Sequence, residues 1–298
     1  MTRITLLDGS IGQELVKRSG DRATPLWSTQ VMIDHPDLVG EVHAAYFCAG
    51  ATIATTNTYA LHRSRLTRGG LEDRIPELME TALTQAERAR AAHGGGRIAG
   101  SLGPLLASYR PDLNPDPDDA AAKFAELTAL MADRVDLILI ETVSLVQEAL
   151  GALRGTRNCA KPVWLSLTVD DDDGTRLRSG EPLTDIAPLV AEFDPQAVLI
   201  NCSRPEAIPA ALDILKTLGK PFGAYANGFT RISEDFLKDA PTVDALEQRT
   251  DLDPATYADH ALGWVEQGAT IVGGCCEVGP DHIEELARRL CAAGHEIT

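Results

Sequence analysis

The chain has 298 residues, 44% of them hydrophobic, which is enough to bury a large core in one barrel-type domain or two ordinary domains. Its 27 basic and 44 acidic residues give a net charge of -17, which opposes binding to a phosphate backbone. The apolar run at 4–7 ends at Asp8, and no stretch is apolar enough to cross a bilayer. We therefore expect a cytoplasmic protein with neither a nucleic-acid nor a membrane partner. Nothing in the sequence indicates an oligomeric state.

Short apolar runs, often rich in β-branched residues, recur along the chain. Each is too short for a helix, and such runs are typical of strands buried on both faces. The expected strands lie at residues 4–8, 51–57, 97–101, 136–141, 162–168, 197–203, 221–227 and 269–275.

Segments with helical spacing of apolar residues lie between these strands. They cover residues 36–50, 72–92, 118–134, 144–157, 183–193, 205–218, 254–267 and 280–292. Strict alternation of strand and helix predicts a parallel sheet, and eight such units predict an α/β fold of the (β/α)8 TIM-barrel type, with residues 1–298 as one domain. The alternative is an open doubly wound sheet, but the first turn, DGSIGQEL, lacks the G-x-G-x-x-G phosphate signature.

Two long irregular connections interrupt this pattern, at 104–118 and 228–253. Each follows a strand. In a barrel, the loops that follow strands lie at the C-terminal mouth, so we expect both connections to cover a substrate.

Three cysteines carry the strongest chemical signal. Cys202 ends the sixth expected strand, and Cys275 with Cys276 ends the eighth, so all three meet at the mouth of the barrel. Three thiolates with one open position are typical of a catalytic zinc site. Cys48, Cys159 and Cys291 lie at or near helix ends and have no ligand partner in the sequence pattern, so we interpret them as structural.

The alternative for the three cysteines is simple burial, because an unpaired cysteine is among the most commonly buried residues. Two adjacent cysteines after a double glycine are harder to explain as core filling. Successive strand residues point to opposite faces, so Cys275 and Cys276 reach one ion only where the chain turns. Gly273 and Gly274 permit that close approach.

The sequence resembles the homocysteine S-methyltransferases over nearly its whole length. The resemblance rests on LLDGSIGQEL at 6–15, TNTY at 56–59, GSLGP at 100–104, ET at 141–142, NCS at 201–203, YANG at 225–228 and GGCCEVGP at 273–280. It implies a zinc-dependent transfer of a methyl group to the thiol of homocysteine, forming methionine. Two departures lie in the first motif, where Ser10 and Gln13 replace a glycine and a threonine and alter the expected carboxylate pocket.

The resemblance also implies roles for individual residues. Cys202, Cys275 and Cys276 match the zinc ligands, which act in catalysis by activating the substrate thiol. Substrate contacts fall on five further positions. Asp8 and Glu141 match the residues that hold the homocysteine ammonium, Gly9 and Ser10 approach its carboxylate through backbone N–H groups, and Asn227 matches a position near zinc when substrate is absent. A structural role as caps or ion-pair partners stays open for Asp8 and Glu141.

Three functional alternatives stay open at this point. We expect a cationic methyl donor, with S-methylmethionine or S-adenosylmethionine as the first choice, because the sequence shows no additional region large enough for separate cobalamin and folate modules. Betaine or another methylated ammonium is the second choice. A zinc hydrolase normally has histidine or carboxylate ligands. A zinc-storing or redox-sensing protein would not need Asp8 and Glu141 in a substrate pocket.

Overall fold

Parallel strands form the centre of the molecule in the computed structural model, which describes residues 1–21, 24–233, 235–238 and 246–298. The strands are β1 (Arg3–Leu6), β2 (Ile53–Thr55), β3 (Arg97–Leu102), β4 (Leu137–Val143), β5 (Val163–Leu167), β6 (Ala197–Asn201), β7 (Phe222–Ala226), β8 (Ile271–Gly274) and β9 (Glu296–Ile297). Their order in the sheet is β2-β3-β4-β5-β6-β7-β8-β1-β9. A parallel bridge between Leu7 and Ile53 joins the end of β1 to β2. The sheet therefore curls into a barrel, as predicted, and the open doubly wound alternative is wrong.

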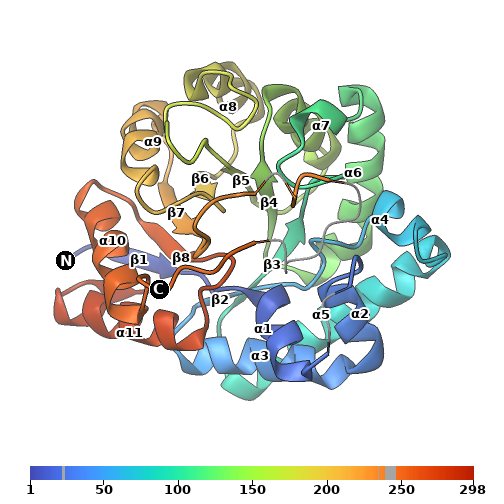
Figure 1. Cartoon of the computed structure of the whole chain (residues 1–298), viewed down its shortest axis with the longest axis horizontal. Helices are drawn as coiled ribbons and strands as arrows, with labels where there is room; N and C mark the ends of the chain where they lie inside the picture. Colours follow the sequence, from blue (N-terminus) through green and yellow to red (C-terminus); the bar gives the residue numbers. More distant parts are fainter. Residues whose placement is uncertain (22–23, 234, 239–245) are drawn as a thin grey trace.

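Helices surround this barrel, with the strands in the middle (Figure 1). They are α1 (Ile11–Ser19), α2 (Ser28–Asp34), α3 (Pro36–Cys48), α4 (Arg63–Thr67), α5 (Ile75–His93), α6 (Pro117–Met131), α7 (Val146–Thr156), α8 (Ala187–Phe193), α9 (Ile208–Leu215), α10 (Pro254–Glu266) and α11 (Pro280–Ala292). All eight predicted helical segments and all eight predicted strands are confirmed. The sequence interpretation missed α1, α2, α4 and β9, which are short.

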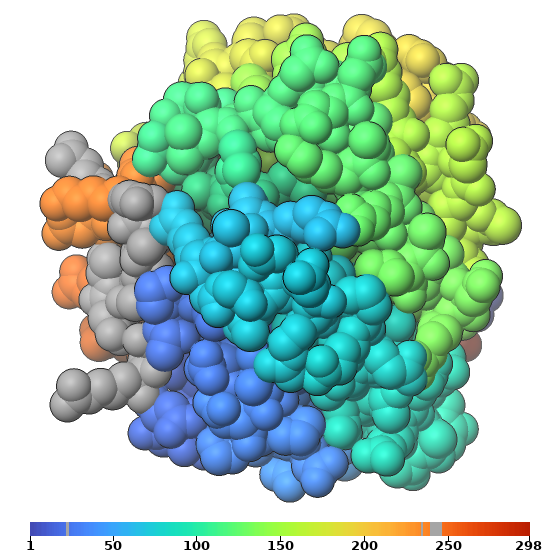
Figure 2. Space-filling model, turned by 90° about the vertical axis from the view of Figure 1, so that its right-hand side faces the viewer, coloured from blue at the N-terminus to red at the C-terminus, as the bar shows by residue number. Residues whose placement is uncertain are grey.

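Helix starts follow local chemistry. Asp116 and Asp253 precede the prolines that open α6 and α10, and each carboxylate accepts a hydrogen bond from a backbone N–H in the first turn. Apolar faces of these helices pack on the outside of the sheet in one large buried cluster. Figure 2 shows one flank of this packed shell, where the cyan α4 and α5 region lies beside the green helices α6 and α7.

Inside the barrel, the part nearer the amino ends of the strands is apolar, and the part nearer their carboxyl ends is polar. A separate buried cluster inside the sheet includes Leu7, Ile53, Ala99, Leu137, Leu139, Trp164, Ala197, Leu199, Tyr225 and Ile271. Side chains alternate along a strand, so residues two positions further on point to the same interior. By this alternation, Ser101, Glu141, Ser166 and Asn201 form the layer nearer the carboxyl ends of the strands. A substrate at the mouth therefore meets buried polar groups.

The two long connections reach the same mouth. Leu106, Tyr109 and Arg110 from 104–118 and Phe229 and Phe236 from 228–253 line a cavity there. Both connections were expected on the substrate side, and the described residues support this. Residues 234 and 239–245 of the second connection lie outside the described part of the chain.

Candidate active site

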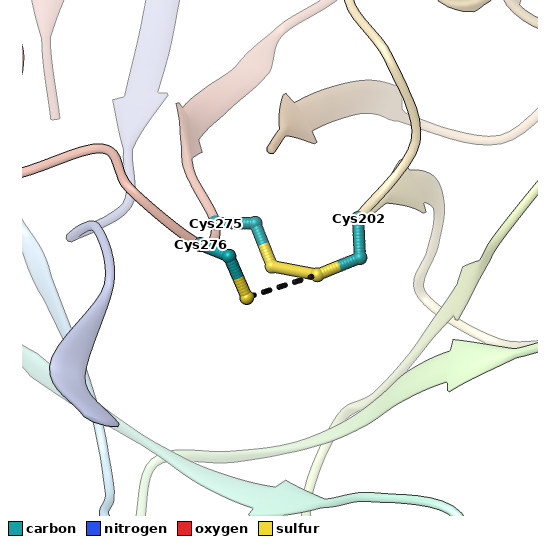
Figure 3. A group of neighbouring side chains, drawn as sticks. All are labelled: Cys202, Cys275 and Cys276. Atoms are coloured by element: carbon teal, nitrogen blue, oxygen red, sulfur yellow. Dashed lines mark hydrogen bonds between the residues drawn. A yellow bond between two sulfur atoms is a disulfide. The ribbon is translucent and has the colours of Figure 1, made fainter. Parts of the chain in front are cut away.

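The three cysteines singled out in the sequence meet at the mouth of the barrel. Cys202 follows β6, and Cys275 and Cys276 follow β8. Their Sγ atoms all lie within 4.8 Å of one another, and no other group of three or more possible metal-binding side chains is found within the described ranges. Figure 3 shows the three side chains pointing toward a common point. Cys48, Cys159 and Cys291 are free cysteines outside this group, as expected.

The double glycine before the cysteines lets β8 approach the end of β1. A Cβ atom on Gly274 would lie 2.2 Å from Cγ1 of Val278, which no side chain permits. The Gly274 N–H donates to the carbonyl of Asp8 at 2.9 Å, so the close approach is also a backbone hydrogen bond. Cys202 itself adopts a left-handed φ of 49°. The strand therefore ends abruptly there, and the Cys202 side chain turns toward β8.

The structure holds the site in an oxidised state. Cys202 and Cys275 form a disulfide, and Sγ of Cys276 lies 3.8 Å from Sγ of Cys202 (Figure 3). A tetrahedral ion with bonds of about 2.3 Å to sulfur keeps its ligands about 3.8 Å apart, so the spacing of Cys202 and Cys276 suits such an ion. Cys202 and Cys275 can join Cys276 as thiolate ligands only after reduction of their disulfide.

Asp8 follows β1 and is buried beside the cysteine group. Its carboxylate accepts two hydrogen bonds from Thr55, one from the backbone N–H at 2.6 Å and one from Oγ1 at 2.8 Å. Burial raises the pKa of Asp8 to about 8, with the nearby charge of Glu141 adding to the increase and the Thr55 bonds opposing it. A buried carboxylate of this kind favours a cationic ligand.

Glu141 points into the barrel, because it lies two residues after Leu139 and four after Leu137, whose side chains are in the interior cluster. Ser101 donates a hydrogen bond to one carboxylate oxygen, and the Tyr225 hydroxyl donates to the other at 3.1 Å. Burial raises the pKa of Glu141 to about 7, against the effect of these two hydrogen bonds. Asp8 and Glu141 thus form two buried acidic groups that interact electrostatically.

Asn201 holds the turn that presents Glu141. Thr142, the next residue, adopts a left-handed φ of 61°, and its backbone N–H donates to Oδ1 of Asn201 at 2.9 Å. The Asn201 amide in turn donates to Oγ1 of Thr142 at 2.9 Å. The same amide lies 4.0 Å from Sγ of Cys275. Asn201 therefore connects the acidic part of the site with the cysteines, although the sequence interpretation assigned it no role.

The backbone N–H of Ser10, which was expected to approach the substrate carboxylate, donates to the carbonyl of Val278 at 2.9 Å. The Ser10 hydroxyl donates to the side-chain carbonyl of Gln13, which also accepts from the Glu277 N–H at 2.8 Å. The two replacements in the first motif therefore join α1 to the turn after β8. Gly9 lies where a Cβ atom would be 2.1 Å from the Val278 carbonyl.

Asn227 supports the backbone of the cysteine group. Its amide donates to the carbonyl of Cys202 at 2.9 Å, and its Oδ1 accepts from the Phe229 N–H at 3.2 Å. Both ends of the side chain are thus engaged in this structure. The position is next to the cysteines, as expected from the sequence.

A cavity of about 580 Å³ joins these groups. The three cysteines, Asp8 and Glu141 line it together with Gly9 and Ser10. Aromatic side chains form much of the remaining wall, and they are Trp27, Tyr59, Tyr109, Tyr225, Phe229 and Phe236. Aromatic rings bind cations over their faces, as Tyr109 does with Arg178 in this structure. Sequence reasoning did not assign these aromatic residues, because their convergence depends on how separate loops fold over the mouth.

The fold and the site define a class of protein, a barrel enzyme whose substrate cavity contains a cluster of thiols and two buried carboxyl groups. Comparisons with known proteins identify the class more closely. A family model described as homocysteine S-methyltransferase matches residues 5–290. A homocysteine S-methyltransferase of Escherichia coli is 32% identical over 96% of this chain and 95% of that protein. The YbgG homocysteine S-methyltransferase of Bacillus subtilis is 27% identical over 95% of this chain and 93% of its own.

A solved structure gives the same result. The metallated form of the homocysteine methyltransferase MmuM from Escherichia coli has a TM-score of 0.81 and 28% identity, covering 97% of this chain and 96% of that one. The chain belongs to the homocysteine S-methyltransferase family. It is an enzyme that transfers a methyl group to homocysteine and forms methionine. Within the residues that the structure describes, no helix has the length and apolar character needed to span a membrane.

Proposed function

We propose that the enzyme binds zinc through Cys202, Cys275 and Cys276 and transfers a methyl group from a cationic donor to the sulfur of homocysteine. The observation that carries this proposal is the approach of three sulfurs to within 4.8 Å in a cavity that also contains Asp8 and Glu141. Soft thiolate ligands favour zinc over magnesium or calcium, which prefer oxygen. Reduction of the Cys202–Cys275 disulfide precedes binding of the ion.

Sulfur reactivity is the chemical problem at this site. Burial raises the pKa of the Cys276 thiol to about 12, with the charges of Glu277 and Glu141 adding to the increase, so an isolated thiol in this cavity keeps its proton at neutral pH. Zinc, when bound, supplies the positive charge that lets a substrate thiol lose its proton and become nucleophilic. The protein's own contribution is to orient homocysteine and to exclude water around its sulfur.

Asp8 and Glu141 suit the ammonium group of homocysteine. Their shared cavity is buried, and both pKa values are raised chiefly because burial removes water from the ionised forms. An ammonium supplies that partner and stabilises both carboxylates in the ionised form. The loop at Gly9 and the hydroxyl of Ser10 border the same space and suit the substrate carboxylate, whereas Asn227 fixes the backbone of Cys202.

The wall of aromatic side chains supports a positively charged methyl donor. Ring faces attract a sulfonium or a methylated ammonium through the same electrostatic effect. We therefore infer a sulfonium donor, S-methylmethionine or S-adenosylmethionine, with betaine as the alternative of the ammonium class. The cationic donor loses its charge as the methyl group leaves, so orientation and a dry cavity account for much of the acceleration.

The test combines metal analysis with an assay of three donors. Protein reduced and loaded with zinc is incubated with homocysteine and, separately, S-methylmethionine, S-adenosylmethionine or betaine, and methionine is measured. We expect one zinc per chain and fastest turnover with a sulfonium. Protein that binds no zinc after reduction, or that methylates homocysteine equally well without metal, would contradict the proposed site. Faster turnover with betaine would contradict the sulfonium donor but would not contradict the proposed zinc site.

A further inference from the structure

One arginine at the cavity has no partner. Among the described arginines that are not exposed, Arg65 is the one whose guanidinium makes no hydrogen bond, ion pair or ring contact. The chain carries 44 acidic residues against 27 basic ones, so acceptors for an arginine are plentiful. By contrast, Arg63 on the same short helix α4 pairs with Glu126. The unpaired state of Arg65 therefore needs an explanation.

Arg65 lines the same cavity as the cysteines, Asp8 and Glu141. Burial lowers its pKa, which means that the surroundings withdraw water from its charge without replacing it by an anion. No ion pair joins Arg65 to Asp8 or Glu141, whose carboxylates accept hydrogen bonds from Thr55, Ser101 and Tyr225. Arg65 is thus a cation that borders the cavity but lies apart from its two acidic groups.

Tyr59 lines the cavity together with Arg65 and Glu141. The pKa of Tyr59 is raised chiefly by burial, and it is also raised by Glu141 and lowered by Arg65, so the phenol interacts with both. Its hydroxyl forms a 2.7 Å hydrogen bond with Ser108. The cavity therefore contains acidic groups, which favour a cation, and the guanidinium of Arg65, which favours an anion. A zwitterionic ligand of the right length satisfies both.

We propose that Arg65 binds the carboxylate of the methyl donor, which makes the donor an amino acid or a similar zwitterion and not a simple sulfonium or ammonium. This inference rests on the proposed function. Guanidinium and carboxylate match in shape and form two parallel charge-assisted hydrogen bonds. Arg65 thereby selects donors that carry an acid group, a role that the aromatic wall does not provide.

The carboxylate in question belongs to the donor and not to homocysteine. In homocysteine the carboxylate and the ammonium are attached to the same carbon, so an ammonium at Asp8 and Glu141 keeps the carboxylate beside them. Arg65 forms no ion pair with either acidic group, since their carboxylates accept from Thr55, Ser101 and Tyr225. The second substrate, the methyl donor, supplies the anion for Arg65.

The reaction itself needs no further reactant. A lone pair on the homocysteine sulfur forms the new S–C bond, the bond between the methyl carbon and the donor heteroatom breaks, and its electron pair stays on that heteroatom. The donor leaves neutral at that atom and still carries its carboxylate. Arg65 takes no part in bond breaking and acts as a specificity-determining residue.

The experiment compares S-methylmethionine with the dimethylsulfonium amine that remains when its carboxyl group is removed. We expect Arg65→Met to raise the KM for S-methylmethionine by about 10- to 100-fold, the range for one lost charge-assisted contact, and to leave the rate with the decarboxylated donor unchanged. Arg65→Lys, which keeps the charge and loses the planar fork, should fall between the two. Arg63→Met is the matched control on α4 and should behave as the wild type.

Three results would overturn the assignment: an equal effect of Arg65→Met on both donors, an increase in the KM for homocysteine, or wild-type enzyme that uses the decarboxylated donor as well as S-methylmethionine. Calorimetric binding of the two donors to zinc-loaded wild type and Arg65→Met gives a readout that does not require turnover. If no donor is turned over, the proposed function fails, whereas the binding comparison still decides the role of Arg65. Circular dichroism confirms that each variant is folded.

Discussion

The body and the mouth of the barrel are built in different ways. In the body, apolar side chains alternate along short strands and fill the interior. At the mouth, strands end in residues with left-handed backbone, and polar side chains are buried. The described non-glycine residues with positive φ are Trp27, Tyr109, Thr142, Asp194, Cys202 and Glu277. All but Asp194 line the cavity or follow Cys276 directly. Such a conformation costs about 1–2 kcal/mol per residue, so strain is concentrated where substrate binds.

Side-chain hydrogen bonds therefore hold the backbone at the mouth, whereas apolar packing fills the body. Asn201 holds the turn at Thr142, and Asn227 holds the backbone of Cys202. Substitutions at the mouth should therefore change chemistry more than stability, and substitutions in the body should do the reverse. The following predictions test that contrast.

The largest effect is expected from the metal ligands. Cys202→Ala, Cys275→Ala or Cys276→Ala removes one of three thiolates and should lower the affinity for zinc by more than about 100-fold, since even indirect partners of a metal site contribute 10–100-fold. Methyl transfer should be lost with the ion, while the barrel stays folded. Metal analysis and circular dichroism on reduced protein measure both. Cys159→Ala is the control. Full zinc occupancy in all three ligand variants would contradict the proposed zinc site.

The acidic pair should have the next largest effect. Glu141→Gln and Asp8→Asn keep the shape of each side chain and remove its charge, so each should weaken homocysteine binding by about 10- to 100-fold while zinc stays bound. Calorimetry with homocysteine and metal analysis separate the two properties. Unchanged affinity in both variants would assign the carboxyl groups to a structural role.

The pH dependence should be smaller and has a definite sign. Asp8 and Glu141 have pKa values raised to about 8 and about 7, and each must lose a proton to bind an ammonium. Affinity for homocysteine should therefore rise as the pH increases from 6 to 8, by up to about tenfold per pH unit for each group still protonated. Asp8→Asn and Glu141→Gln should each flatten this profile. A profile that falls over the same interval would contradict the ionised form as the binding form.

The smallest effects are expected at two residues with a left-handed backbone, Thr142 at the mouth and Asp194 at the end of α8. Thr142→Gly at the mouth relieves the left-handed backbone but removes a hydrogen bond to Asn201, so the KM for homocysteine should rise by about 2- to 10-fold. Asp194→Gly at the end of α8 relieves the same kind of strain and should change the free energy of unfolding by no more than about 1 kcal/mol, with unaltered turnover. Urea denaturation and steady-state kinetics measure the pair. Equal effects of both on turnover would remove the contrast between body and mouth.

The strands that form the body of the barrel could be predicted from the sequence. Each strand is an apolar run of its own, and the position of Cys202, Cys275 and Cys276 at strand ends predicted their convergence. Arg65 and the role of Asn201 could not be predicted in the same way. Arg65 lies on a helix of five residues, too short to have an amphipathic pattern, and its lack of a partner exists only in the packed molecule. The bonds of Asn201 depend on the turn at Thr142, which no local residue preference indicates.

The Cys202–Cys275 disulfide changes the number of thiols that can be labelled in the chain. The chain has six cysteines, and four of them are free when Cys202 and Cys275 are joined. A mass tag that reacts with thiols in denaturant should therefore add four labels to the oxidised chain and six to the reduced one. The share of chains that carry six labels and not four reports the fraction of molecules in which Cys202 and Cys275 are reduced. Intact-mass measurement of a preparation thus gives the fraction with all three site cysteines reduced before an assay begins.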